Sequence, residues 1–259
     1  MSIATDLQTI ANNVPLVYNA GVEAGKAQGG GGGDTSEVIA QFTETIQTSA
    51  KMLGSDYNYA FYKSPLAEET FSQIMQAWGS SKVISRSEFM FSQAPNVGEA
   101  LYTDKLDLSK ARTAREMFSS SGVTKLKTID LRKAESGFNG MANVFGDCGN
   151  LVSIDEFYPS TLVNFSGTFV SCYALKTVIF KSVISVSGLD IRHSQSLNKE
   201  SIESIINNLS STTSGLTVTL SLIAVNRAFE TSTGAQDGST SAEWTTLTGT
   251  KTNWTIAYA

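Results

Sequence analysis

One unit of a degenerate repeat reads VFGDCGNLVSID at residues 144–155. The phenylalanine of this unit recurs along the middle third of the chain, at intervals of 27, 27 and 24 residues, as Phe91, Phe118, Phe145 and Phe169. Leucines and isoleucines follow each phenylalanine in a repeated order. A period in the twenties is typical of a stacked solenoid of the leucine-rich type, in which no unit buries its apolar edge alone. Residues 81–195 are therefore predicted to form a short leucine-rich-repeat solenoid.

The composition is that of a folded chain with no strong electrostatic signature. The 259 residues are enough for one long repeat domain and an appendage. The net charge of −5 and the absence of a basic patch argue against nucleic acid as a partner. The uncharged stretches are short, which argues against membrane insertion. The first residues lack the basic start and apolar core of a secretory signal, so folding in a cytoplasm is expected.

Residues 1–53 are predicted to be a helical segment that anchors or oligomerises the chain. Its apolar residues are spaced alternately by three and four, as in the seam of a coiled coil. The seam consists of Leu7, Ile10, Val14, Val17, Ile39, Phe42, Ile46 and Leu53. A run of five glycines at 29–33 divides it and is typical of a flexible linker. The alternative is a helix that packs against its own domain.

The flanks of the repeat are predicted to close its two ends. Residues 54–80 form an aromatic neck or N-terminal cap, in which 56–62 alternate as a strand would and 68–78 form a short helix. The aromatic run has a second interpretation, a platform on which sugars stack. Residues 196–259 form a C-terminal α/β cap, which begins with a helix that Asn198 caps. The fold class predicted for the whole chain is α+β.

Two cysteines occupy the same place in successive units. Cys148 and Cys172 each lie three residues after a repeat phenylalanine. Stacked units would place them one above the other, as a ladder of small buried thiols. A disulfide or a metal site is the alternative, although two thiols without a nearby histidine make a poor zinc site.

Three aspartates are also aligned by the repeat. Asp107, Asp130 and Asp155 each follow a leucine or isoleucine at the end of a unit. Like charges stacked in one column destabilise a sheet, so something must compensate them. The two interpretations are neighbouring lysines, Lys110 and Lys133, and a bound hard cation such as calcium.

No residue pattern in the sequence predicts an enzyme or a cofactor. The single histidine, His193, lies in the stretch DIRHS at 190–194, beside residue types that a catalytic triad uses. A triad needs partners that the fold brings together from separate places, so this stretch is interpreted as a solvated loop. No catalytic, cofactor-binding or metal-binding residue is therefore proposed from the sequence.

Parts of the chain resemble a known family. The unit at 144–155 resembles the BspA-type leucine-rich repeat, with departures where Ala94 and Ser121 replace the cysteine. Residues 3–21, 56–61 and 251–256 are similar to segments of phage and prophage tail or fibre proteins. The resemblance implies a virion protein of the tail, baseplate or fibre, assembled in the host cytoplasm.

The resemblance also implies partners. The N-terminus would join other virion proteins. The chain itself would form a homotrimer, as fibre-type coiled coils commonly do, and the repeats would contact a glycan or protein of the host surface. Two alternatives remain open, a structural or decoration virion protein without a ligand and a repeat module that binds another protein. The resemblance transfers no functional residues, because the pattern is that of a scaffold.

Overall fold

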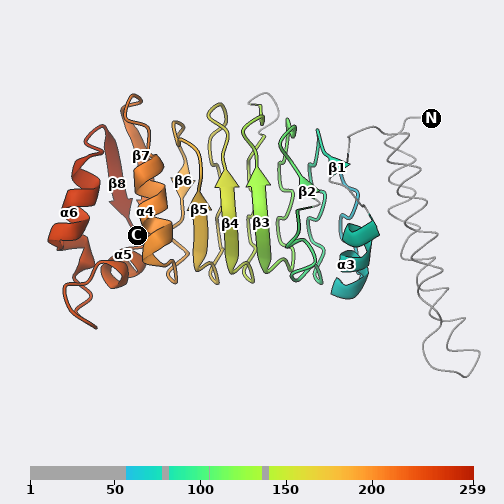
Figure 1. Cartoon of the computed structure of the whole chain (residues 1–259), viewed down its shortest axis with the longest axis horizontal. Helices are drawn as coiled ribbons and strands as arrows, with labels where there is room; N and C mark the ends of the chain where they lie inside the picture. The colour runs from blue at the N-terminus through green and yellow to red at the C-terminus, as the bar shows by residue number, and fades with distance from the viewer. Residues whose placement is uncertain (1–56, 78–81, 105, 136–139) are drawn as a thin grey trace, which may run out of the picture.

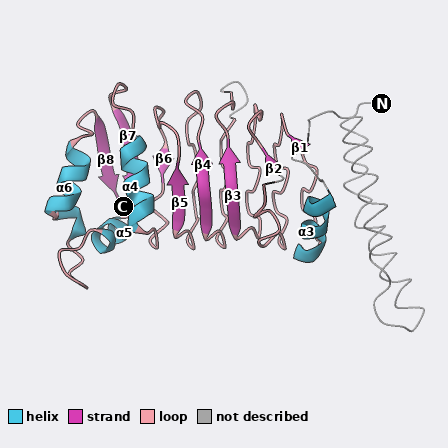
Figure 2. Cartoon of the chain, viewed as in Figure 1, coloured by secondary structure: helices cyan, strands magenta, loops and turns pink. Residues whose placement is uncertain are grey.

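The computed structural model of the chain describes residues 57–77, 82–104, 106–135 and 140–259. The helices are α3 (Glu68–Ala77), α4 (Lys199–Asn208), α5 (Leu222–Ala228) and α6 (Ala242–Gly249), with a 3-10 turn η2 (Gly238–Thr240). The strands are β1 (Lys82–Val83), β2 (Leu106–Asp107), β3 (Lys125–Asp130), β4 (Ser153–Tyr158), β5 (Thr177–Phe180), β6 (Leu189–Asp190), β7 (Leu216–Leu220) and β8 (Trp254–Tyr258). Figure 2 shows α4, α5 and α6 together at the C-terminal end and α3 at the opposite end.

The strands form three small parallel sheets, in the orders β1-β2, β3-β4-β5 and β6-β7-β8. Figure 1 shows β1 to β5 side by side along the long axis of the molecule. Parallel strands cannot be joined by a tight hairpin, so the chain must cross back after each strand. One strand and its return segment make one layer, and successive layers lie against each other.

The return segments carry a five-residue turn that begins and ends with a left-handed residue. These residues have φ between 50° and 64°. The first positions are Tyr59, Phe89, Glu116, Asn143 and Gly167, and the last are Lys63, Gln93, Ser120, Asp147 and Ser171. Backbone hydrogen bonds join equivalent turns, as from Glu116 N–H to the Ala142 carbonyl at 2.9 Å. Because the backbone itself specifies the turn, its sequence varies from layer to layer.

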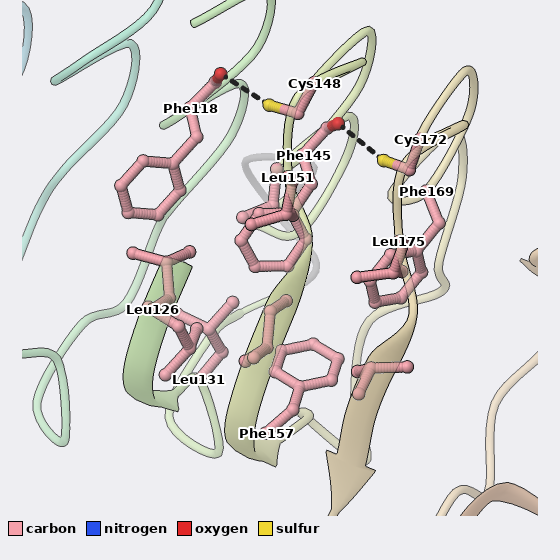
Figure 3. Close-up of a cluster of buried hydrophobic side chains, with 14 of the residues drawn as sticks. Phe118, Leu126, Leu131, Phe145, Cys148, Leu151, Phe157, Phe169, Cys172 and Leu175 are labelled. Carbon is pink, nitrogen blue, oxygen red and sulfur yellow. Dashed lines mark hydrogen bonds between the residues drawn. The ribbon is translucent and has the colours of Figure 1, made fainter. Parts of the chain in front are cut away.

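The repeat phenylalanines lie in the middle of these turns and stack in one buried column. Centroid distances between successive rings are 5.2, 5.6, 5.6 and 5.4 Å, from Phe61 through Phe91, Phe118 and Phe145 to Phe169. All five side chains are at most 2% exposed. Figure 3 shows three of the rings above the apolar residues of the strands. This column is the centre of the core.

The predicted ladder of buried thiols is confirmed. Cys148 Sγ donates to the Phe118 carbonyl at 2.9 Å, and Cys172 Sγ donates to the Phe145 carbonyl at 3.1 Å (Figure 3). Both thiols are free and buried. Each buried thiol therefore has a hydrogen-bond acceptor, a carbonyl oxygen of the layer before it. This bond replaces the one to water that the thiol loses on burial.

Helix α4 continues the sheet β3-β4-β5 in place of a fourth strand. Ser201 Oγ accepts the Val178 N–H at 2.9 Å, and Ser204 Oγ accepts the Phe180 N–H at 3.2 Å. Asn208 Nδ2 donates to the Phe180 carbonyl at 2.9 Å. Polar side chains on one helix face thus satisfy the edge of β5, which would otherwise be open to pairing with another chain.

The cap of α4 and the helix itself are confirmed as predicted. Asn198 Oδ1 accepts the Ser201 N–H at 2.9 Å, which satisfies a free N–H group of the first turn. Ile202, Ile205 and Ile206 are buried on one face. Helix α3, predicted over 68–78, also forms, and its Phe71 packs edge-on against Phe61 at 5.7 Å, at the opposite end of the column.

The predicted fold class, an α+β leucine-rich-repeat solenoid behind N-terminal helices, is wrong. The architecture is mixed α/β, with small parallel sheets and with four helices in the described part of the chain. Phenylalanines rather than leucines fill the central column, and the strands are only two to six residues long. The return segments are turns rather than strands, and backbone hydrogen bonds join the equivalent turns of adjacent layers.

Two predictions for the N-terminal part have different outcomes. The strand predicted at 56–62 is wrong where the structure describes it, because residues 58–63 are a succession of turns. Tyr57 and Phe61 are buried while Tyr59 is 39% exposed, whereas a strand would place these three side chains on one face. The helices predicted at 1–53, with the glycine linker at 29–33, lie outside the described residues.

Gly122→Ala is expected to lower the free energy of unfolding by about 1–3 kcal/mol. A Cβ at this position would lie 1.8 Å from the Pro95 carbonyl oxygen in the adjacent layer. That oxygen belongs to the backbone, so the two layers must separate to admit the methyl group. The matched control is Gly149→Ala, whose Cβ meets nothing within 4 Å. Urea denaturation of the two variants checks the contact, and equal stabilities would contradict it.

Candidate functional site

A charged face covers the outer side of strands β3 and β4 and the segment that precedes β2. It consists of Glu99, Tyr102, Asp104, Lys125, Lys127, Asp155 and Glu156. The register that pairs Leu126 with Ile154, and Thr128 with Glu156, places Lys127 next to Asp155. Leu126 and Ile154 are fully buried, whereas Lys127 and Asp155, the next residue along each strand, are partly exposed.

Two ion pairs join neighbouring layers across this face. Lys125 Nζ lies 2.8 Å from Glu99 Oε1, and Lys127 Nζ lies 2.7 Å from Asp104 Oδ2. The hydrogen bond from each lysine to its carboxylate raises the pKa of that lysine above its ordinary value. Both lysines therefore stay charged at neutral and moderately alkaline pH, although solvent screens such exposed pairs strongly.

Tyr102 connects layers that are not adjacent in the repeat. Its hydroxyl donates to the Asp155 carboxylate, 53 residues further along the chain. That hydrogen bond, followed by the charge of Asp155, raises the pKa of Tyr102. The tyrosine remains 43% exposed, which makes it one of the large exposed aromatic side chains of the described chain. An exposed ring held by a hydrogen bond loses little conformational freedom when a partner covers it.

The charges of the face alternate from layer to layer. Carboxylates of Glu99 and Asp104 come first, then the two lysines, then the carboxylates of Asp155 and Glu156. Thr128 Oγ1 donates to Glu156 Oε2 at 3.2 Å and fixes the last of these groups. Exposed pairs of this kind contribute little to stability, about 0–1 kcal/mol each. The pattern is therefore better suited to recognising a partner of complementary polarity than to holding the fold.

The predicted column of three aspartates does not exist. The register places Asp130 opposite Tyr158, and Asp155 lies three residues before Tyr158, next to Lys127. Asp130 pairs with its own neighbour Arg132, whose Nη2 lies 2.6 Å from Asp130 Oδ2. The described residues hold no group of three histidine, cysteine or acidic side chains arranged for a metal ion. The calcium hypothesis falls with the alignment on which it depended. Of the two lysines predicted to compensate, Lys133 does help to lower the pKa of Asp130: burial opposes the ionisation of this carboxyl, but the hydrogen bonds and charge of Arg132, followed by the charge of Lys133, outweigh it.

Asp107 and Asp130 have a local role at the ends of their strands. Asp107 Oδ1 accepts the Ser109 N–H at 2.9 Å, and Asp130 Oδ1 accepts the Arg132 N–H at 3.1 Å. An aspartate that accepts the N–H two residues ahead starts a turn. These side chains therefore end the strands rather than bind an ion.

The single histidine and the two cysteines lie apart from the charged face. His193 Nδ1 accepts the Ser171 N–H at 3.0 Å, and its ring lies 5.6 Å from that of Tyr173. Burial raises the pKa of Cys148 to about 12 and raises that of Cys172 as well. Thiols in this state are protonated at neutral pH and have weak nucleophilicity.

The seam predicted to oligomerise the chain lies outside the described residues, as do all its members: Leu7, Ile10, Val14, Val17, Ile39, Phe42, Ile46 and Leu53. The residues of the charged face were not predicted from the sequence as a site. Glu99, Tyr102 and Asp104 lie between two repeat units, where no period marks them. Lys125 and Lys127 alternate with Leu126 as in a strand. This pattern predicts that both lysine side chains lie on the solvent face.

No family model, curated protein or solved structure matches the chain. Among the residues that the structure describes, none of the helices combines the length and apolar character that crossing a bilayer requires.

Proposed function

We propose that the chain is a virion protein of a phage tail, baseplate or fibre that recognises a host surface through its charged face. The virion part of this proposal depends on the resemblance of residues 3–21, 56–61 and 251–256 to tail and fibre proteins. On this proposal the N-terminal segment joins other virion proteins and assembles the chain as a trimer. The partner at the charged face is a glycan or protein of the host cell surface.

One observation carries the recognition part of the proposal: the charged face presents paired charges and an exposed tyrosine on a rigid base. The Phe118 and Phe145 rings beneath it stack at 5.6 Å, and both side chains are fully buried. Strands β3 and β4 pair over five residues each in one register. Side chains on such a base are already placed for a partner, so binding orders few additional groups.

Binding of the purified full chain to bacterial cells tests the proposal. Fluorescently labelled protein is titrated onto a panel of strains, and bound fluorescence is read by flow cytometry. We expect saturable binding to at least one strain, and a loss of about thirtyfold in affinity for Tyr102→Ala, since buried aromatic contacts often contribute 2 kcal/mol or more. Lys127→Glu reverses a charge of the same face and is expected to act in the same direction.

The matched control is Tyr173→Ala, which removes another exposed tyrosine, on the turn that follows Cys172. It should bind as the unchanged protein does. Equal losses for Tyr102→Ala and Tyr173→Ala would contradict recognition by the charged face. An absence of binding to every strain would favour the structural or decoration virion protein instead.

A further inference from the structure

A groove lies on another part of the molecule, between the last five-residue turn and strands β6 and β7. It has a volume of ≈ 380 Å³. Small-molecule sites in proteins commonly have about 300–1,000 Å³. The lining residues come from three segments: Gly167, Ser187, Gly188, Leu189, Asp190, Gly215, Leu216, Thr217 and Thr219. None of the residues of the charged face is among them.

The repeat changes at its fifth turn, which borders the groove. The first left-handed position carries a side chain in the earlier turns, and Gly167 takes it here with φ 64°. A Cβ at Gly167 would lie 1.8 Å from Asn143 Oδ1, so the amide of the previous layer lies over this glycine. Gly188 and Gly215 also line the groove with φ 87° and 74°, and a Cβ at Gly215 would meet nothing within 4 Å.

One carboxylate lines the groove in a fixed orientation. Arg192 Nε donates to both carboxylate oxygens of Asp190 at 2.9 Å, and Arg192 Nη2 lies 2.6 Å from Oδ2. Burial opposes the ionisation of Asp190, but the hydrogen bonds from Arg192 outweigh it and lower the pKa of the carboxyl. The Arg192 backbone N–H also donates to Asp190 Oδ1 at 3.2 Å. An ionised carboxylate has about four lone-pair sites, so these three N–H groups leave room for about one hydroxyl donor.

Hydroxyl groups without a protein partner complete the lining. In the described part of the chain, the side chains of Ser187, Thr217 and Thr219 make no hydrogen bond to protein. Thr217 and Thr219 lie two residues apart on β7 and therefore face the same side. Asp190 lies opposite Thr219 in the pairing of β6 with β7. The groove thus combines one strong acceptor with three groups that both donate and accept.

This set of groups selects against several classes of ligand. Arg192 is paired with Asp190, so no free positive charge attracts an anion. A single carboxylate already bound by a guanidinium is a poor ligand for a hard cation, which needs several oxygens. The lining has more apolar than polar surface, but a purely apolar molecule would still remove water from its hydroxyls without compensation. A ligand that carries several neutral hydroxyls satisfies every one of these groups.

We propose that this groove binds a neutral saccharide unit, with the Asp190 carboxylate accepting a hydrogen bond from a ring hydroxyl and Thr217 and Thr219 completing the contacts. The saccharide is either free in solution or the terminal unit of a longer glycan. The proposal is independent of the charged face and of the proposed virion function, because it depends on the groove alone.

Nuclear magnetic resonance titrations of the ¹⁵N-labelled full chain test the groove. The probes are glucose, galactose, mannose and N-acetylglucosamine. We expect at least one of them to shift the amide signals of residues 187–190 and 215–219 in a saturable way. Thr217→Val and Thr219→Val keep the shape and the β-branch of the side chain, and each should weaken that sugar by about fivefold to tenfold through the lost hydrogen bond.

The matched control is Thr255→Val, since Thr255 pairs with Thr217 across β7 and β8 but does not line the groove. It should leave the affinity unchanged, and circular dichroism checks that all three variants stay folded. Binding that survives both groove variants, or the absence of saturable shifts with all four sugars, would overturn the proposal. The groove and the charged face are tested separately, because Tyr102→Ala should not alter sugar binding to the groove. Sugar binding can therefore be observed even if the host-recognition proposal fails.

Discussion

Phe145→Ala is expected to lower the free energy of unfolding by about 4 kcal/mol, in the middle of the range for buried aromatic truncations. Phe145 is fully buried in the middle of the column. Its ring stacks on Phe118 at 5.6 Å and on Phe169 at 5.4 Å, and Phe157 meets it edge-on at 5.9 Å. Backbone hydrogen bonds hold the layers on both sides, so they cannot collapse into the space left by the ring.

The control for this prediction is Tyr173→Ala, which removes a ring that is 61% exposed. Its effect should stay within about 0.5 kcal/mol, as for most surface substitutions. Urea denaturation followed by far-ultraviolet circular dichroism measures both variants. A loss for Phe145→Ala no larger than that for Tyr173→Ala would show that the column is not the centre of stability.

Alkaline pH is expected to destabilise the protein steeply through its two thiols. Burial is the main cause that raises the pKa of Cys148 from 9.0 to about 12, and burial raises that of Cys172 too. Between these values the unfolded chain releases a proton that the folded chain keeps, so rising pH favours unfolding. Each thiol then contributes a slope of up to about 1.4 kcal/mol per pH unit. Below pH 9 the same thiols have no effect on the pH dependence.

The double variant Cys148→Ala/Cys172→Ala separates this effect from that of the tyrosines. The pKa of Tyr57 is also raised by burial, so the tyrosines destabilise the protein in the same direction. Alanine already stands at the equivalent place of an earlier layer, as the fully buried Ala94, which makes it a tolerable replacement. Melting temperatures measured from pH 8 to 11 should fall less steeply in the variant, as the linkage relation requires. Parallel curves would contradict the role of the buried thiols.

The stacking of phenylalanines and cysteines could be predicted from the sequence, because the same residue type recurs at the same position of successive units. The α4 cap was also predictable, since Asn198 and the isoleucines behind it form a local pattern. The five-residue turns were not predictable. Their left-handed positions hold residues as different as Phe89 and Asp147, and hydrogen bonds between layers rather than side chains stabilise them.

The aspartate alignment was wrong for a physical reason. Apolar residues in these units recur every third position, so shifting one unit by three still brings apolar residues together. Leu126 pairs with Ile154 and Ile129 with Phe157. The alignment of Ile129 with Ile154 keeps the apolar pattern but moves Asp130 beside Asp155, where like charges would repel. Tyr102 could not be predicted to reach Asp155, because that contact depends on the spacing of three layers.

Chemical footprinting on bound cells tests recognition by the charged face most directly. Lysines of the free and cell-bound protein are acetylated with a soluble reagent and quantified by mass spectrometry. We expect protection of Lys125 and Lys127 in the bound protein. Lys110 and Lys181, which are exposed elsewhere, should react equally in both states. Protection of Lys110 or Lys181 without protection of Lys125 and Lys127 would contradict recognition by the charged face.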